Sequence, residues 1–197
     1  LRKRGVQAAS QMGDGTPVEP EQVTRENLFA FLERIGERWT SSASFYLLGG
    51  GALGLLGNLR ETRDLDYTVD LPGDLLNDFR RAAVEVASDM HLDLEEVPIG
   101  EFLPLPPGAY ERKRFVGRFG QVEVFVFDLY SIALSKIARG FESDLDDVMF
   151  MLQARLVQFW ELQRYFQTIL PQAAKFDIDP REFRQYFEEI GRRLLAS

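Results

Sequence analysis

The sequence predicts an α+β protein in which a small mixed β-sheet flanked by helices is followed by an α-helical C-terminal half. Up to about residue 128, short apolar or alternating runs of strand length are interspersed with amphipathic helical runs. From about residue 130 onward, every periodic run has helical spacing. The chain of 197 residues is long enough to bury a core. We therefore expect a flexible lead-in at 1–23, an α/β domain at 24–128 and a helical region at 129–197.

The first elements surround a glycine-rich turn. A helix is expected at 24–39, because Thr24 can act as its N-cap and apolar residues follow at helical spacing. The short apolar run at 45–48 is typical of a buried strand. The glycines at 49–51 then turn the chain into a short helix, which Gly57 and Asn58 end.

Three further strands and one helix complete the predicted sheet half. A strand at 65–69 precedes a helix at 75–89, for which Asp74 is the expected N-cap. The weak alternation at 92–97 is typical of an edge strand. After a proline-rich loop, strands at 113–118 and 122–127 are expected to form a hairpin.

Four helices are expected in the second half, over 131–139, 143–156, 158–170 and from Pro180 onward. Asp128 is the expected cap of the first, and Ser143 with Asp146 approximates a capping box for the second. Aromatic and aliphatic residues of the last two lie at helical spacing, so we expect core packing rather than base stacking. They are Phe159, Trp160, Leu162, Tyr165, Phe166, Ile169, Phe183, Tyr186, Phe187 and Ile190.

The bulk composition excludes several classes of protein. The formal net charge is −8, whereas proteins that grip long duplex nucleic acids usually carry a basic face. No apolar run approaches the roughly 18 residues of a membrane span, and no apolar segment follows the basic start, so we expect a cytoplasmic protein without a secretory signal. With no cysteine and a single histidine, His91, any metal must be held by oxygen, which favours Mg²⁺ or Mn²⁺.

The sequence motif richest in chemistry is the glycine turn followed by two aspartates. Asp64 and Asp66 are two residues apart, so on a strand both carboxylates face one side, about 6.5–7 Å apart at their Cα atoms. Gly49 and Gly50 permit a backbone to approach a phosphate. Each fragment also has a plainer explanation: an acidic pair on a solvent face, and a glycine turn that packs a helix closely on a strand.

A third acid lies on a later predicted strand. Glu123 is flanked by Val122 and Val124, in a strand able to pair near the strand of the two aspartates. An inward carboxylate needs a metal or a basic partner, because burying it unpaired is costly. The pattern fits equally well with Glu123 facing solvent on a one-sided sheet.

The order of these motifs resembles that of the nucleotidyltransferase superfamily with the polymerase-β-like fold. The resemblance rests on Leu48-Gly49-Gly50, on the Arg60-x-Thr62-x-Asp64-x-Asp66 segment and on Val122-Glu123-Val124. The Arg60-to-Asp66 segment looks particularly like minimal bacterial and abortive-infection toxin-type nucleotidyltransferases. The resemblance continues through Lys136 and 143–148, and covers 45 to about 155.

The resemblance implies transfer of a nucleoside monophosphate from an NTP to a hydroxyl group. Asp64, Asp66 and Glu123 would be the catalytic carboxylates and hold Mg²⁺ or Mn²⁺. Gly49 and Gly50 would bind the triphosphate. The acceptor would be a protein, a tRNA or a small molecule, and an antitoxin protein would be a further partner.

Three other residues have weaker assignments. Lys136 is a candidate phosphate contact or a lysine on a helix surface. Arg60 and Thr62 shape the turn before the strand, with Arg60 also a candidate for binding phosphate.

The sequence departs from the family pattern at Glu123, where aspartate is commoner, and at Ser143, where an arginine is expected. These departures motivate an alternative hypothesis, a catalytically silent copy of the fold that acts as a binding or regulatory module. A structural protein whose acids only solvate a sheet is a third hypothesis.

Overall fold

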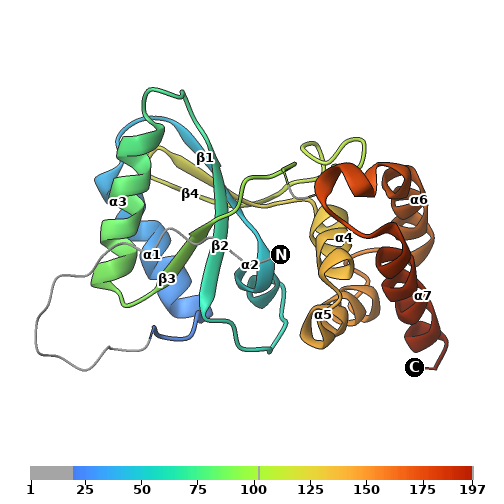
Figure 1. Ribbon diagram of the computed structural model, residues 1–197. Helices are drawn as coiled ribbons and strands as arrows, with labels where there is room; N and C mark the ends of the chain where they lie inside the picture. The colour runs from blue at the N-terminus through green and yellow to red at the C-terminus, as the bar shows by residue number, and fades with distance from the viewer. Residues whose placement is uncertain (1–19, 102, 197) are drawn as a thin grey trace, which may run out of the picture.

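The computed structural model describes residues 20–101 and 103–196, and its first half is built on a five-stranded mixed sheet (Figure 1). The strand order is β3-β2-β1-β5-β4. The strands span Ala43–Leu47 (β1), Asp64–Asp70 (β2), Asp93–Glu96 (β3), Arg114–Phe119 (β4) and Val122–Val126 (β5). β1 runs antiparallel to β2 and parallel to β5, so the sheet is mixed, as the sequence predicts.

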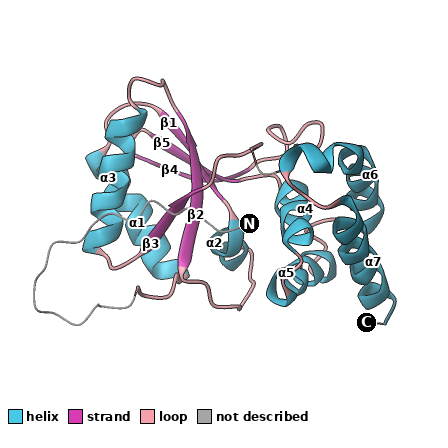
Figure 2. Cartoon of the chain, in the orientation of Figure 1, coloured by secondary structure: helices cyan, strands magenta, loops and turns pink. Residues whose placement is uncertain are grey.

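Helices α1 (Arg25–Arg38) and α3 (Leu76–Asp89) cover one face of the sheet (Figure 2). Leu65 and Tyr67 of β2 are buried beneath this layer, and Tyr67 stacks on Phe45 of β1. The alternating residues of β2 therefore face away from α1 and α3. Helix α2 (Gly49–Leu55) follows β1 directly at its carboxyl end.

The second half is helical and lies beside the sheet half (Figure 1). It contains α4 (Leu129–Arg139), α5 (Glu142–Gln153), α6 (Phe159–Ile169), the 3₁₀ helix η1 (Leu170–Phe176) and α7 (Pro180–Ala196). The buried apolar side chains of both halves form one continuous cluster. In the part of the chain that the structure describes, no helix combines the length and apolar character that crossing a membrane requires.

Two of the four expected N-caps are found, and two are not. Thr24 caps α1 in a capping box with Asn27, and Asp128 caps α4 through the N–H groups of Tyr130 and Ser131. The expected caps at Asp74 and Ser143 are wrong. Helix α3 begins after Leu75, and α5 begins after Phe141, without a side-chain cap in either case.

One further expectation needs correction. Trp160 is exposed on α6, whereas Leu162 and Phe166 carry the buried face of that helix. Helix α6 ends at Ile169, before Pro171, as expected, and Pro171 lies in the first turn of the separate 3₁₀ helix η1, where proline is tolerated. Of the expected lead-in, residues 1–19 lie outside the described residues. Within 20–23, the N–H groups of Glu21 and Val23 donate to His91 and Thr62.

Candidate functional site

The glycine turn and strand β2, which carries Asp64 and Asp66, meet at the carboxyl end of β1. The N–H of Leu48 donates to the carbonyl of Asp66 at 2.9 Å, and the next residue, Gly49, has a φ of 54° and begins α2. A Cβ at Gly49 would overlap Oδ2 of Asp66. A Cβ at Gly50 would lie 2.8 Å from both Cβ and Oγ1 of Thr62. Both glycines therefore allow the chain of 62–66 to pack directly on the turn.

Asp64 and Asp66 share the face of β2 that points away from α1 and α3. Their register partners on β3 are Asp93 and Glu95. Four carboxylates consequently stand on one face of two neighbouring strands, since paired residues of parallel strands face the same side. Burial, followed by the nearby charges of Glu95 and Asp64, raises the pKa of Asp66 to about 6.

Cationic side chains of α4 face this acidic region from the helical half. The charges of Arg139 and Lys136 act against the rise in the pKa of Asp66, so both lie near enough to influence it. Arg139 is half exposed, and its guanidinium donates to Oδ1 of Asp144 at 2.7 Å. The arginine holds further N–H donors in its fixed planar fork.

Lys136 is buried, unlike the surface lysine that the sequence allowed. Its Nζ donates to Oδ2 of Asp147 at 2.6 Å and to Oδ1 of Asp144 at 3.0 Å. The buried Oδ2 of Asp144 has no hydrogen-bond partner among the described residues. Lys136 is therefore first of all the counter-ion of two buried aspartates, because a buried charge needs a partner.

Arg60 connects the sheet half to this buried network. Its Nε and a terminal nitrogen bind the two oxygens of Asp147 at 2.8 and 2.7 Å, and Asn58 donates to the same carboxylate at 2.8 Å. The hydrogen bond with Asp147 raises the pKa of Arg60. The loop between α2 and β2 is thereby held against α5 (Figure 1). Thr62 lies against Gly50, and its hydroxyl donates to the carbonyl of Asp64 at 3.4 Å in the turn before β2.

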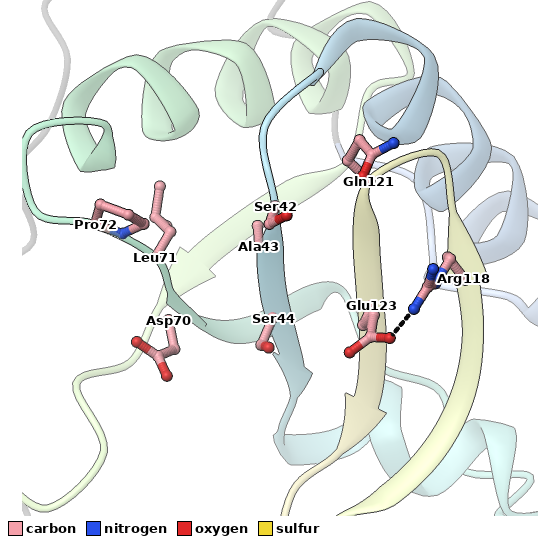
Figure 3. A pocket seen from close by; sticks show the side chains of 9 residues that line it. All are labelled: Ser42, Ala43, Ser44, Asp70, Leu71, Pro72, Arg118, Gln121 and Glu123. Atoms are coloured by element: carbon pink, nitrogen blue, oxygen red, sulfur yellow. Dashed lines mark hydrogen bonds and ion pairs between the residues drawn. The ribbon is translucent and has the colours of Figure 1, made fainter.

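The structure does not bring Glu123 to the two aspartates. Ser44 of β1 pairs with Asp70 on one side and with Glu123 on the other, so Glu123 lies level with Asp70. Asp70 is four residues beyond Asp66, which is about 13 Å along a strand. The Glu123 carboxylate binds Arg118 of β4 instead (Figure 3). The position of β5 level with Asp66 is just past Val126 and carries Phe127, which is buried.

A divalent cation at this site would have two strand carboxylates, Asp64 and Asp66, as protein ligands. Among the described residues, no group of three or more histidine, cysteine, aspartate or glutamate side chains gathers closely enough to hold a metal. Mg²⁺ is commonly bound by one or two carboxylates together with substrate phosphates and water. The donor set therefore fits a cation that arrives with a nucleotide rather than one caged by protein alone.

Sequence reasoning did not single out Glu95 and Arg139, and it included Asp144 and Asp147 in the resemblance at 143–148 without assigning them a role. Glu95 had a weak signal, since it sits in the alternating edge strand. Asp144 and Asp147 follow Lys136 by 8 and 11 residues, on the next helix, and only the turn at Gly140 aligns them with the lysine.

Comparison with known families and structures gives one match. A model of the family described as "Nucleotidyltransferase of unknown function (DUF6036)" matches residues 26–193. The match spans the glycine turn, the aspartate pair and the helical half. Neither the search of curated proteins nor that of solved structures returned a match.

Proposed function

The chain belongs to this nucleotidyltransferase family, and we propose that it transfers a nucleoside monophosphate from an NTP to a hydroxyl acceptor with the help of Mg²⁺ or Mn²⁺. One observation carries the proposal: Asp66 packs over the Gly49 turn, with Asp64 on the same strand face and two cations of α4 nearby. Acidic ligands, a glycine turn and cationic side chains are the parts that phosphoryl transfer needs.

The carboxylates of Asp64 and Asp66 would hold the cation. A divalent ion bound there neutralises charge on the transferred phosphoryl group and on the leaving pyrophosphate. The pKa of Asp66 is raised by burial and by neighbouring acids, so a bound cation would stabilise its charged form.

Other residues would bind and orient the triphosphate. The N–H groups of Gly49 and Gly50 lie in the first turn of α2, where helical N–H groups have no partner within the helix. The half-exposed guanidinium of Arg139 would contact phosphate oxygens, which planar arginine forks bind well. Asp144 would fix the position of Arg139, and Lys136 would favour binding of the triphosphate through its positive charge.

The test is transfer of label from each α-labelled NTP, in the presence of Mg²⁺, to components of a cell lysate. We expect label transfer by the native chain and a loss of at least 100-fold in the Asp66→Asn variant, because its neutral amide is a poor ligand for a hard cation. Asp89→Asn, which changes an acid at the end of α3, is the matched control and should transfer label normally. A native protein that transfers no label from any NTP would sink the proposal.

A silent binding module is the second candidate function. It is favoured by the position of Glu123, which leaves no third acid beside Asp64 and Asp66 on β5. Calorimetry with NTP separates the two hypotheses. Binding that requires Mg²⁺ and is lost in Asp66→Asn supports the enzyme, whereas binding that is unchanged without Mg²⁺ and in the variant supports the module.

The acceptor, and a role as the toxin of a toxin–antitoxin pair, are finer proposals. The net charge of −8 favours a protein or small-molecule acceptor over a large RNA. The toxin role rests on the resemblance of the Arg60-to-Asp66 segment alone. Growth arrest on expression of the native chain, absent for Asp66→Asn and relieved by the product of a neighbouring gene, is the outcome that this role requires.

A further inference from the structure

A cavity lies on the same sheet face as Asp66, at the opposite end of the strands. It has a volume of about 530 Å³ and is lined by side chains from four adjacent strands and from the loop after β2 (Figure 3). Register places Asp70, Ser44, Glu123 and Arg118 in one row across β2, β1, β5 and β4. The small Ser44 between two acids leaves the row hollow at its centre.

The charges around this cavity are unbalanced. Two carboxylates line it, and Arg118 is the single cation among its lining residues. Arg118 binds Oε1 of Glu123, and no hydrogen bond or ion pair to Oε2 is found in the part of the chain that the structure describes. Asp70 likewise has no hydrogen bond or ion pair among the described residues. The cavity thus presents carboxylate oxygens on both sides of Ser44, with one cation to balance two acids.

The remaining lining combines apolar and neutral polar surface. Leu71 and Pro72 form a wall beside Asp70, and Ser42 and Gln121 supply hydroxyl and amide groups near the start of β1 and β5 (Figure 3). An apolar wall next to carboxylates suits a ligand with an aliphatic stem and a cationic head, since such side chains bury the stem and keep the charge paired.

We propose that this cavity is a binding site for a primary amine on a short aliphatic stem, with the ammonium group between Asp70 and Glu123 and the stem against Leu71 and Pro72. The ammonium provides three donors, which the two carboxylates and the Ser44 hydroxyl can accept. The Cα atoms of Asp70 and Glu123 lie about 10 Å apart across two strand spacings, and both side chains are long enough to reach one ammonium placed above Ser44. The site is separate from the proposed nucleotide site and does not depend on nucleotide transfer.

The first test uses Nα-acetyl-lysine amide as the probe in an NMR titration of the full chain. We expect saturable shifts of backbone amides at 42–44, 70–72 and 118–123. Nα-acetyl-norleucine amide has a similar stem without the ammonium and should cause no saturable shift there. Equal effects of the two probes, or shifts spread over all acidic surfaces, would overturn the proposal.

Variants of Asp70 and Glu123 test directly whether these two carboxylates bind the ammonium group. Asp70→Asn and Glu123→Gln should each weaken binding of the lysine probe about fivefold, and the double variant should abolish it. Asp89→Asn, an exposed acid elsewhere, is the matched control and should bind as the native chain does. Chemical denaturation of each variant confirms that it is folded before its affinity is compared.

The variant Arg118→Gln best distinguishes a site for a cation from a site for an anion and from a purely structural role of Arg118. Arg118 competes with the ligand for Glu123, so its removal should strengthen binding of the lysine probe about threefold. A site for an anion, or a residue with a purely structural role, predicts weaker or unchanged binding instead. Unchanged or weaker binding of the lysine probe in Arg118→Gln therefore contradicts the proposed ligand chemistry.

Discussion

At the scale of single residues, Gly49 is the position where backbone freedom and site geometry coincide. Its φ of 54° is one that residues with a Cβ adopt at a cost of about 1–2 kcal/mol. Its bare Cα is also the surface on which the Asp66 carboxylate rests. The glycine is therefore required twice, by the turn and by the acid above it.

Gly49→Ala should consequently remove function as well as stability. We expect the free energy of unfolding to fall by more than about 1–2 kcal/mol, because the new Cβ must also displace the Asp66 carboxylate. Mg²⁺-dependent NTP binding, measured by calorimetry, should be lost. Gly54→Ala is the control: it lies in the same helix with open space around it, and should raise stability by about 0.5–1 kcal/mol. Native-like NTP binding by Gly49→Ala would contradict this account.

Asp147 is the residue on which the two halves converge. Burial favours its neutral form, yet the hydrogen bond from Arg60 and the charge of Lys136 hold the pKa of Asp147 below its usual value. A group with a lowered pKa stabilises the fold fully above its unfolded pKa of about 3.9. That stabilisation is lost as pH falls through the lower pKa of the folded state.

Asp147→Asn should lower the free energy of unfolding by about 3 kcal/mol near neutral pH, because it leaves buried cations without a charged partner. Urea unfolding across a range of pH measures the effect. The difference between native and variant chains should be constant from about pH 5 to pH 8 and shrink below about pH 4. A difference that persists undiminished in acid would show that the Asp147 charge is not its source.

At the scale of elements, the capping of α5 is where the sequence misleads. Ser143 resembles a cap, but α5 already begins at Glu142, so Ser143 lies inside the first turn. Phe141 occupies the N-cap position with extended backbone, an exposed ring and no side-chain hydrogen bond to the helix. The N–H groups of that turn are therefore without a side-chain cap.

Phe141→Ser should raise the free energy of unfolding by about 0.5–1 kcal/mol, since serine can accept from the first turn and little packing is lost. Ser143→Ala should change it by less than about 0.5 kcal/mol. Thermal denaturation of both variants measures these changes in stability. Thr24→Ala, which removes a true cap, is the control. If Ser143→Ala lowers the free energy of unfolding more than Thr24→Ala does, Ser143 caps α5 as the sequence predicts.

The elements themselves were largely predictable, because hydrophobic periodicity is local. Helices α1, α3, α4, α6 and α7 and all five strands lie where apolar spacing placed them. The position of Glu123 was not predictable. The alternation of apolar and polar residues along a strand tells which face of the sheet a side chain takes, but not which residues of the neighbouring strands lie beside it. The neighbours of Glu123 are set by the register of β5 on β1, which pairs Glu123 with Ser44.

The site was predictable only as far as it is local in sequence. The Gly49 turn and the face shared by Asp64 and Asp66 follow from glycine geometry and strand alternation. The network of Lys136, Asp144 and Asp147 depends on how α5 folds back on α4, and its link to Arg60 depends on the packing of the two halves. Tertiary contacts of this kind leave no periodic signal.

At the scale of the whole molecule, two ion-pair contacts between described residues join the halves in addition to the shared core. Arg60 binds Asp147, as described above. Arg112, in the loop before β4, binds both oxygens of Asp128 at 2.8 Å and lies over the ring of Tyr165 of α6, 4.5 Å from its centroid. Because Asp128 and Asp147 are buried, their charges cannot reach water: Arg112 balances that of Asp128, and Arg60 shares that of Asp147 with Lys136.

This arrangement predicts that the halves unfold together. In a Trp160→Phe background, fluorescence reports Trp39, which packs on Phe79 in the sheet half. Far-UV circular dichroism reports chiefly the helical half, which holds most of the helix. The two urea transitions should coincide, as expected for one cooperative unit. In the combined Arg60→Met and Arg112→Met variant they should separate, with the helical signal lost first, because Asp128 and part of the Asp147 network lose their counter-ions there. Transitions that already differ in the parent chain would mean that the two arginines do not couple the halves.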